Sequence, residues 1–145
     1  MAKMGMSRSP NKLTALGIGS CIVITLYDPV LKAGALAHSM LPDSIKGEAS
    51  ENPIKYANLA IDVMIKKLKS IGSRRKDLEA KIVGGADMFP NIGEDVETGE
   101  ANVLAVKEKL KKEGIRLTGE AVGGSVGRSV EFDLTTGIVT IKIKI

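Results

Sequence analysis

The stretch LGIGSCIVITLYDP, residues 16–29, decides the architecture of this chain. Its β-branched apolar run, bounded by Gly19 and Asp28, predicts a buried strand over 18–27. Asp28 and Pro29 are the residue types that favour the first and second positions of a tight turn. Residues 31–40 are rich in small side chains and predict a returning strand. The stretch therefore predicts a β-hairpin whose first strand is buried.

Further elements follow outward from this hairpin. Asn52 and Pro53 are typical of a helix start, and apolar residues at helical spacing continue to Leu68, before Gly72 ends the helix. The patterns also predict a helix over 99–113 and strands over 80–83, 115–122, 129–134 and 138–145. The last strand carries its lysines on one face, which favours a position near a sheet edge. We expect an α+β (α/β layered) fold of mixed or antiparallel β-sheets packed with two main helices.

The length of 145 residues predicts one domain. Residues 1–12 are mostly small, polar and Met-rich, and are interpreted as a flexible N-terminal arm before a single domain over 13–145. The chain has one cysteine, so an internal disulfide is excluded.

Composition excludes several classes of function. The net charge of +4 is scattered, and aromatic residues make up only 3% of the chain, so we expect no nucleic-acid partner. One cysteine and one histidine cannot supply a four-ligand zinc site, and no metal or cofactor is expected. No apolar run approaches the roughly 20 residues that span a bilayer, and the first residues lack a secretory signal. These features predict a cytoplasmic protein that is not inserted in a membrane.

The single cysteine and the single histidine fall on the two strands of the predicted hairpin. If Asp28 pairs with Leu31 across the turn, the same register places Cys21 directly opposite His38 on one face of the sheet. An adjacent imidazole can generate the thiolate needed for attack on an acyl or amide carbonyl. A lone cysteine in an apolar strand is, however, more often a small buried hydrophobic residue. Pattern alone leaves both interpretations open.

Glycine-rich segments surround the candidate nucleophile. The glycines before Cys21 allow close approach of a substrate, and backbone N–H groups near Gly19, Ser20 and Cys21 could bind an oxyanion. The segment GGSVGR, residues 123–128, lacks the phosphate-loop pattern and is most simply a tight connection between strands. Alternatively it lines the cysteine site, where Ser125 contacts a protein substrate and Arg128 anchors it.

Several motifs taken together resemble one family. They are LGIGSC (16–21), LYDP (26–29), AHSMLP (37–42), IVGGADMF (82–89), GEANV (99–103) and GGSVGR (123–128). In this order and spacing they resemble the chemoreceptor glutamine deamidases called CheD, from about residue 13 to the C-terminus.

The resemblance implies a cysteine-hydrolase fold similar to the catalytic domain of the cytotoxic necrotising factor toxins. It also implies that Cys21 is the nucleophile, that His38 is its base, and that the substrates are glutamine side chains of chemoreceptor cytoplasmic domains. A glutamate methyl ester could be hydrolysed by the same attack. A phosphatase of the CheC type is implied as a partner. The alternative function is a non-catalytic partner that activates this phosphatase.

The chain departs from the family pattern at two positions. The family usually carries a threonine six residues before the cysteine as the third catalytic residue, and this position is Ala15 here. Thr14 is the substitute candidate, although one residue along a strand is the opposite face. The family also usually carries an arginine where this chain has Ala101.

Overall fold

The computed structural model describes residues 2–42, 52–87 and 98–143. The helices of these residues are α1 (Ala57–Ser70) and α2 (Thr98–Glu113), with 3-10 turns at Pro53–Lys55 and Arg75–Asp77. The strands are β1 (Lys3–Arg8), β2 (Lys12–Ile18), β3 (Ile22–Asp28), β4 (Ala33–Ser39), β5 (Glu79–Gly84), β6 (Arg116–Val122), β7 (Arg128–Asp133) and β8 (Val139–Ile143).

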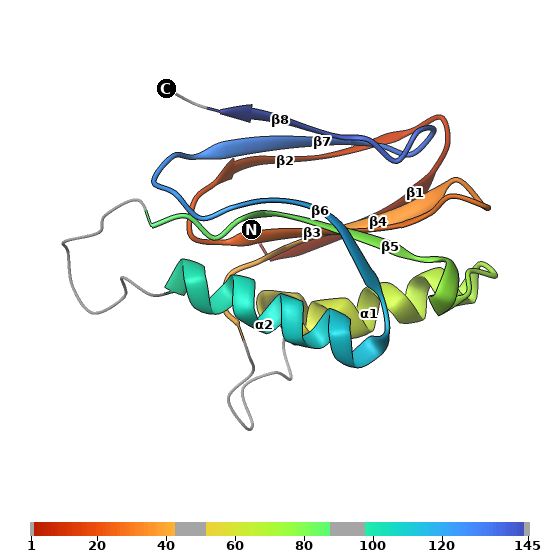
Figure 1. Cartoon of the computed structure of the whole chain (residues 1–145). Coiled ribbons are helices and arrows are strands. Elements are labelled where there is room, and N and C mark those ends of the chain that lie inside the picture. Colours follow the sequence, from red (N-terminus) through yellow and green to blue (C-terminus); the bar gives the residue numbers. More distant parts are fainter. Residues whose placement is uncertain (1, 43–51, 88–97, 144–145) are drawn as a thin grey trace.

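These elements form three layers (Figure 1). The middle layer is a sheet of strand order β1-β4-β3-β5-β6, and a smaller sheet of order β2-β7-β8 packs on one of its faces. Helices α1 and α2 cover the other face. The pair β5–β6 is parallel and the other pairs are antiparallel. The expected α+β class, with mixed sheet and two main helices, is confirmed.

Strand β3 lies at the centre of the middle layer, and all its residues are buried. Ile22, Ile24 and Leu26 belong to the core that faces the helices. Val23 and Tyr27 belong to the second core, between the two sheets. A strand that is covered on both faces needs apolar residues on both, and for this reason residues 22–27 do not alternate between apolar and polar side chains.

The two sheets are joined by aromatic packing. The rings of Tyr27 and Phe132 meet edge to face, with centroids 5.8 Å apart. The Tyr27 hydroxyl donates a hydrogen bond to the carbonyl of Leu134 at 2.9 Å. A Cβ added to Gly34 would lie 2.9 Å from the Phe132 ring, so this glycine lets the sheets approach closely.

The first predicted helix begins later than expected. The side chain of Asn52 accepts a hydrogen bond from the N–H of Ile54 at 3.2 Å, but it caps the 3-10 turn at Pro53–Lys55. Tyr56 is extended, with φ −107°, and forms an isolated bridge with Leu41. This bridge interrupts the helical path, so α1 starts at Ala57.

The expectation of a flexible arm over 1–12 is corrected for residues 3–8. They form β1, which pairs antiparallel with β4 along its length. Met4 and Met6 pack against the helix-facing core. Their burial supplies the free energy that orders this segment, and the composition of a short terminal stretch did not reveal its partner strand. Strand β2 was also missed, apart from its last residue.

The predicted hairpin register is wrong by two residues. Asp28 pairs with Ala33, so Val23 lies opposite His38. The Asp28 carboxylate accepts hydrogen bonds from the N–H groups of Val30 and Leu31, at 2.8 and 3.1 Å. These bonds favour a four-residue loop in place of the predicted two-residue turn. A shift of two preserves which face each side chain occupies.

Strand β8 lies at one end of the strand order of the small sheet, as its lysine-bearing face predicts. Residues 144–145 of the predicted strand lie outside the described residues. Neither helix of the described ranges is long and apolar enough to cross a membrane.

Candidate active site

His38 lies on β4, and Cys21 lies in the loop that leads into the neighbouring strand β3, directly before Ile22. The β3–β5 ladder ends at the pair Ile22–Gly84, and one residue beyond it the carbonyl of Cys21 accepts a hydrogen bond from the N–H of Gly85 at 2.8 Å. An extended continuation of β3 by one residue would place the Cys21 side chain on the face of Val23. Val23 lies opposite His38, so Cys21 is two residues along the chain from the residue that pairs with His38.

The loop that carries Cys21 is held through three successive carbonyl groups. The carbonyl of Gly19 accepts from the N–H of Ala86 at 2.9 Å, and that of Cys21 from Gly85. The carbonyl of Ser20, between them, accepts from the side-chain amide of Asn102 on α2 at 2.8 Å. The backbone N–H groups of Ser20 and Cys21 donate to no carbonyl among the described residues. Such N–H groups are suitable donors for an oxyanion.

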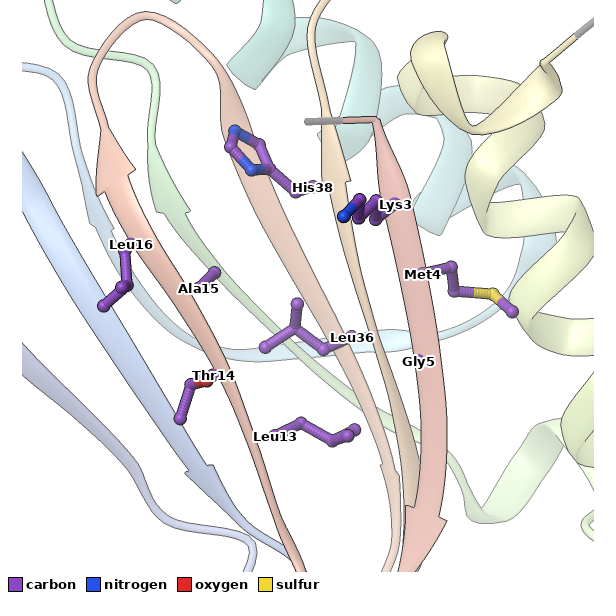
Figure 2. Close-up of a pocket in the computed structure, with 9 residues that line it drawn as sticks. All are labelled: Lys3, Met4, Gly5, Leu13, Thr14, Ala15, Leu16, Leu36 and His38. Carbon is purple, nitrogen blue, oxygen red and sulfur yellow. The ribbon is translucent and has the colours of Figure 1, made fainter.

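His38 points into a cavity of about 420 Å³ between the two sheets (Figure 2). Lys3 and Leu36 line it from the middle sheet, and residues 13–16 line it from β2. Lys3 pairs with His38 across β1 and β4. The Nε2 atom of His38 is buried and has no hydrogen-bond partner among the described residues. The imidazole therefore has a nitrogen that no group of the described residues engages.

Both candidate groups are held in their neutral forms. Burial raises the pKa of the Cys21 thiol, and a hydrogen bond from its own backbone N–H opposes part of this effect. Burial lowers the pKa of His38. At neutral pH the site therefore holds a thiol and a neutral imidazole, which is the form of histidine that accepts a proton.

The structure does not connect Thr14 to His38 by a hydrogen bond. Figure 2 shows Thr14 and Leu16 on one side of β2 and Ala15 on the other, toward the cavity. Thr14 is exposed, whereas Ala15 is 8% exposed. The irregularity in the β2–β7 pairing falls after Ala15, so it does not turn Thr14 inward.

The segment at 123–128 is tied to the cysteine loop through Gly84 and Gly85. The N–H of Gly123 donates to the carbonyl of Gly84 at 3.0 Å. Arg128 donates to the carbonyl of Gly123 at 2.9 Å and to that of Gly84 at 3.4 Å. Ser125 is exposed. The segment thus stands beside the candidate site, but the guanidinium of Arg128 is engaged by backbone oxygens of this chain.

Within residues 2–42, 52–87 and 98–143, no three side chains among His, Cys, Asp and Glu are grouped to hold a metal ion. A second cavity, of about 540 Å³, is lined by Gly85, by residues of α2 and by residues 122–124.

Two residues near the site were not singled out from the sequence. Lys3 was placed in the arm, and Asn102 was quoted only within a motif. A polar residue among the inward-facing apolar positions Val103, Val106 and Leu110 of α2 is the sequence signal that could have identified Asn102.

The fold and the site define a class of protein: a layered α+β domain with its only cysteine in the loop before β3 and its only histidine on the adjacent strand β4. The chain belongs to the CheD family, since the family model described as "CheD chemotactic sensory transduction" matches residues 40–143.

Named relatives extend the match to nearly the whole chain. One is a "Probable chemoreceptor glutamine deamidase CheD" of Clostridium botulinum (strain Hall), 43% identical over 145 residues, covering 98% of this chain and 89% of the relative. The protein of the same name from strain Eklund 17B is 43% identical over 145 residues, covering 99% of this chain and 90% of the relative. The suspected resemblance is thereby confirmed.

Proposed function

We propose that this protein is a chemoreceptor glutamine deamidase, which hydrolyses the side-chain amide of protein glutamine to glutamate and ammonia. The observation that carries the proposal is that the only thiol of the chain directly precedes β3 while the only imidazole lies on the adjacent strand β4, opposite Val23, in a chain of this family. The printed name of the relatives supports the same reaction.

The first half of the proposed reaction forms a thioester. The Cys21 sulfur attacks the carbonyl carbon of the glutamine side chain while neutral His38 accepts the thiol proton. The developing oxyanion is bound by the N–H groups of Ser20 and Cys21, with Gly19 leaving room for the substrate. His38 then donates its proton to the nitrogen, and ammonia leaves as the C–N bond breaks.

The second half regenerates the enzyme. His38 removes a proton from water, and the resulting hydroxide attacks the thioester carbon. The C–S bond breaks, the thiolate recovers the proton from His38, and glutamate is released. The same steps applied to a glutamate methyl ester would release methanol, so a weak methylesterase activity is part of the proposal.

The substrate is proposed to be the cytoplasmic domain of a chemoreceptor, which places the reaction in the cytoplasm. Ser125 is exposed beside the cysteine loop and is proposed to contact this domain. Arg128, engaged with Gly84 and Gly123, is proposed to shape that contact surface. We further propose that the fold is that of the cysteine hydrolases related to the cytotoxic necrotising factor catalytic domain, and that a CheC-type phosphatase binds this protein.

The test is mass spectrometry of a receptor cytoplasmic fragment after incubation with the protein. The wild type should convert particular glutamines to glutamate, and Cys21→Ala and His38→Gln should abolish the conversion. Thr140→Ala, an exposed change on β8, is the matched control and should retain full activity. Conversion by Cys21→Ala at the wild-type rate would refute the proposal.

One observation favours the alternative of a non-catalytic phosphatase activator. Ala15 supplies no hydroxyl to the cavity, and His38 Nε2 has no partner among the described residues. On this alternative no receptor glutamine changes, while the protein binds a CheC-type phosphatase and raises its rate. Cys21 would then alkylate slowly with iodoacetamide, at a rate that does not depend on His38.

A further inference from the structure

Asn102 links the two segments that carry Cys21 and His38. Its side-chain nitrogen donates to the carbonyl of Ser20 at 2.8 Å and to the carbonyl of Met40 at 3.2 Å. Ser20 directly precedes Cys21, and Met40 follows His38 by two residues. Both partners are acceptors, so the amide nitrogen must face them. One fully buried side chain thus spans the cysteine loop and the end of β4.

The bond to Ser20 determines which way the Cys21 N–H points. In a trans peptide the carbonyl of one residue and the N–H of the next point in opposite directions. A Ser20 carbonyl turned toward α2 therefore turns the Cys21 N–H away from α2. This N–H is the proposed oxyanion donor, and it also lowers the pKa of the Cys21 thiol.

Other carbonyls of the loop do not depend on a side chain. Those of Gly19 and Cys21 accept from the backbone N–H groups of Ala86 and Gly85. The peptide between Ser20 and Cys21 is held from α2 by the Asn102 amide. The Oδ1 atom of Asn102 is buried without a partner among the described residues, which is destabilising and unusual for a core position. An apolar residue at this position would avoid the cost of a buried, unpartnered oxygen, but it could not donate a hydrogen bond to the cysteine loop.

We propose that Asn102 is a positioning residue of the site. It orients the Ser20–Cys21 peptide so that the Cys21 N–H faces the thiol and the oxyanion, and it sets the distance between the cysteine loop and the strand of His38. Its effect on turnover rests on the proposed deamidase function, whereas its effect on the thiol and the imidazole does not.

The experiment compares Asn102→Leu with Val106→Ala in the full chain. Leucine has a similar volume but cannot donate a hydrogen bond. Val106 lies one turn further along α2 and is fully buried, so its truncation loosens the helix without touching the loop. Because the chain has one cysteine and one histidine, iodoacetamide alkylation reports Cys21 alone and imidazole NMR signals report His38 alone.

In Asn102→Leu we expect kcat for receptor deamidation to fall about a hundredfold with KM changed by less than about threefold, as for loss of an oxyanion donor. The pH at which Cys21 alkylation rises should move upward, because the thiolate loses its N–H donor, and the His38 signals should shift. Val106→Ala should keep the wild-type alkylation profile and His38 signals. Should Asn102→Leu not fold, Asn102→Ala, which also cannot donate a hydrogen bond, carries the same expectations.

A wild-type alkylation profile in the Asn102 variants, or the same change in Val106→Ala, would overturn the proposal. If the wild type deamidates no receptor, the proposed function fails, and the alkylation and NMR comparison still decides the role of Asn102.

Discussion

At the scale of single residues, Ala15 is the position where a substitution is most expected to raise the deamidation rate. Its methyl group borders the cavity that holds His38, whose Nε2 atom is buried without a partner among the described residues. A threonine there would place a hydroxyl on the side of β2 that faces the imidazole. A hydrogen bond that holds the base in position is worth roughly 1 kcal/mol.

We therefore predict that Ala15→Thr increases the receptor deamidation rate about three- to tenfold, which corresponds to that free energy. The measurement is the initial rate of glutamate formation by mass spectrometry. Ala15→Val has the same shape without the hydroxyl and should give no increase, and Thr14→Val should be neutral because Thr14 points to the other side of β2. An equal gain from Ala15→Val would assign the effect to packing.

The pH dependence of kcat/KM follows from the neutral state of the His38 imidazole and the Cys21 thiol. Burial lowers the pKa of His38 from its ordinary 6.5 and raises that of Cys21 from 9.0. The imidazole stays able to accept a proton below pH 6.5, so kcat/KM should remain on a plateau there and decline only through the lowered pKa. A pH–rate profile that falls by half already at 6.5 would contradict this prediction.

The free energy of unfolding should depend on pH through the same two groups, His38 and Cys21. The folded state favours neutral His38, so its contribution is present above pH 6.5 and is lost as the pH falls through the lowered pKa. It also favours the neutral thiol, so that contribution is present below pH 9.0 and is lost as the pH rises through the raised pKa. His38→Gln in urea unfolding at several pH values is the control for the acid side.

At the scale of elements, the crossing of α2 over the end of β5 positions the site. A Cβ added to Gly99 would lie 2.5 Å from the carbonyl oxygen of Gly85 and 2.7 Å from that of Ala86. Only a residue without a side chain allows the helix this close, and the close approach is what lets Asn102 reach the cysteine loop.

Gly99→Ala should therefore destabilise the protein by about 1–3 kcal/mol through overpacking and also reduce deamidation. Urea unfolding and the receptor assay measure the two effects. Gly119→Ala is the control, because its added Cβ would meet only the Lys81 side chain at 3.5 Å and beyond, which is an ordinary contact. Wild-type stability in Gly99→Ala would show that α2 can shift without loss.

At the scale of the whole molecule, the cavity depends on the packing of two sheets. Phe132 is 1% exposed and lies between them against Tyr27 and Gly34. Its removal would leave a void in the core between the two sheets, which is the smaller of the two cores.

We predict that Phe132→Ala lowers the free energy of unfolding by about 3–5 kcal/mol, the usual range for a buried phenylalanine. Urea denaturation monitored by circular dichroism measures the change. Ile143→Ala, at a side chain that is 58% exposed, should be close to neutral. A loss below about 1 kcal/mol for Phe132→Ala would mean that the two sheets are held together elsewhere.

The sequence by itself determined the class of fold and the strands β3 to β8 within a few residues, and it made Cys21 and His38 the candidate pair. These follow from local information: apolar periodicity, turn residues and residue counts do not require a partner to be known. The predicted face of His38 relative to β3 also survived the error in register, because a shift of two residues preserves the side-chain period.

Only the tertiary structure decided the rest. The pairing of β1 with β4, the outward position of Thr14, the engagement of Arg128 with Gly84 and Gly123, and the link from Asn102 to Ser20 all join residues far apart or on opposite faces. Such contacts depend on which surfaces meet when the layers pack. A short segment contains no information about the distant atoms that satisfy its hydrogen bonds, and for that reason the local pattern identified the reactive groups but not the residues that hold them.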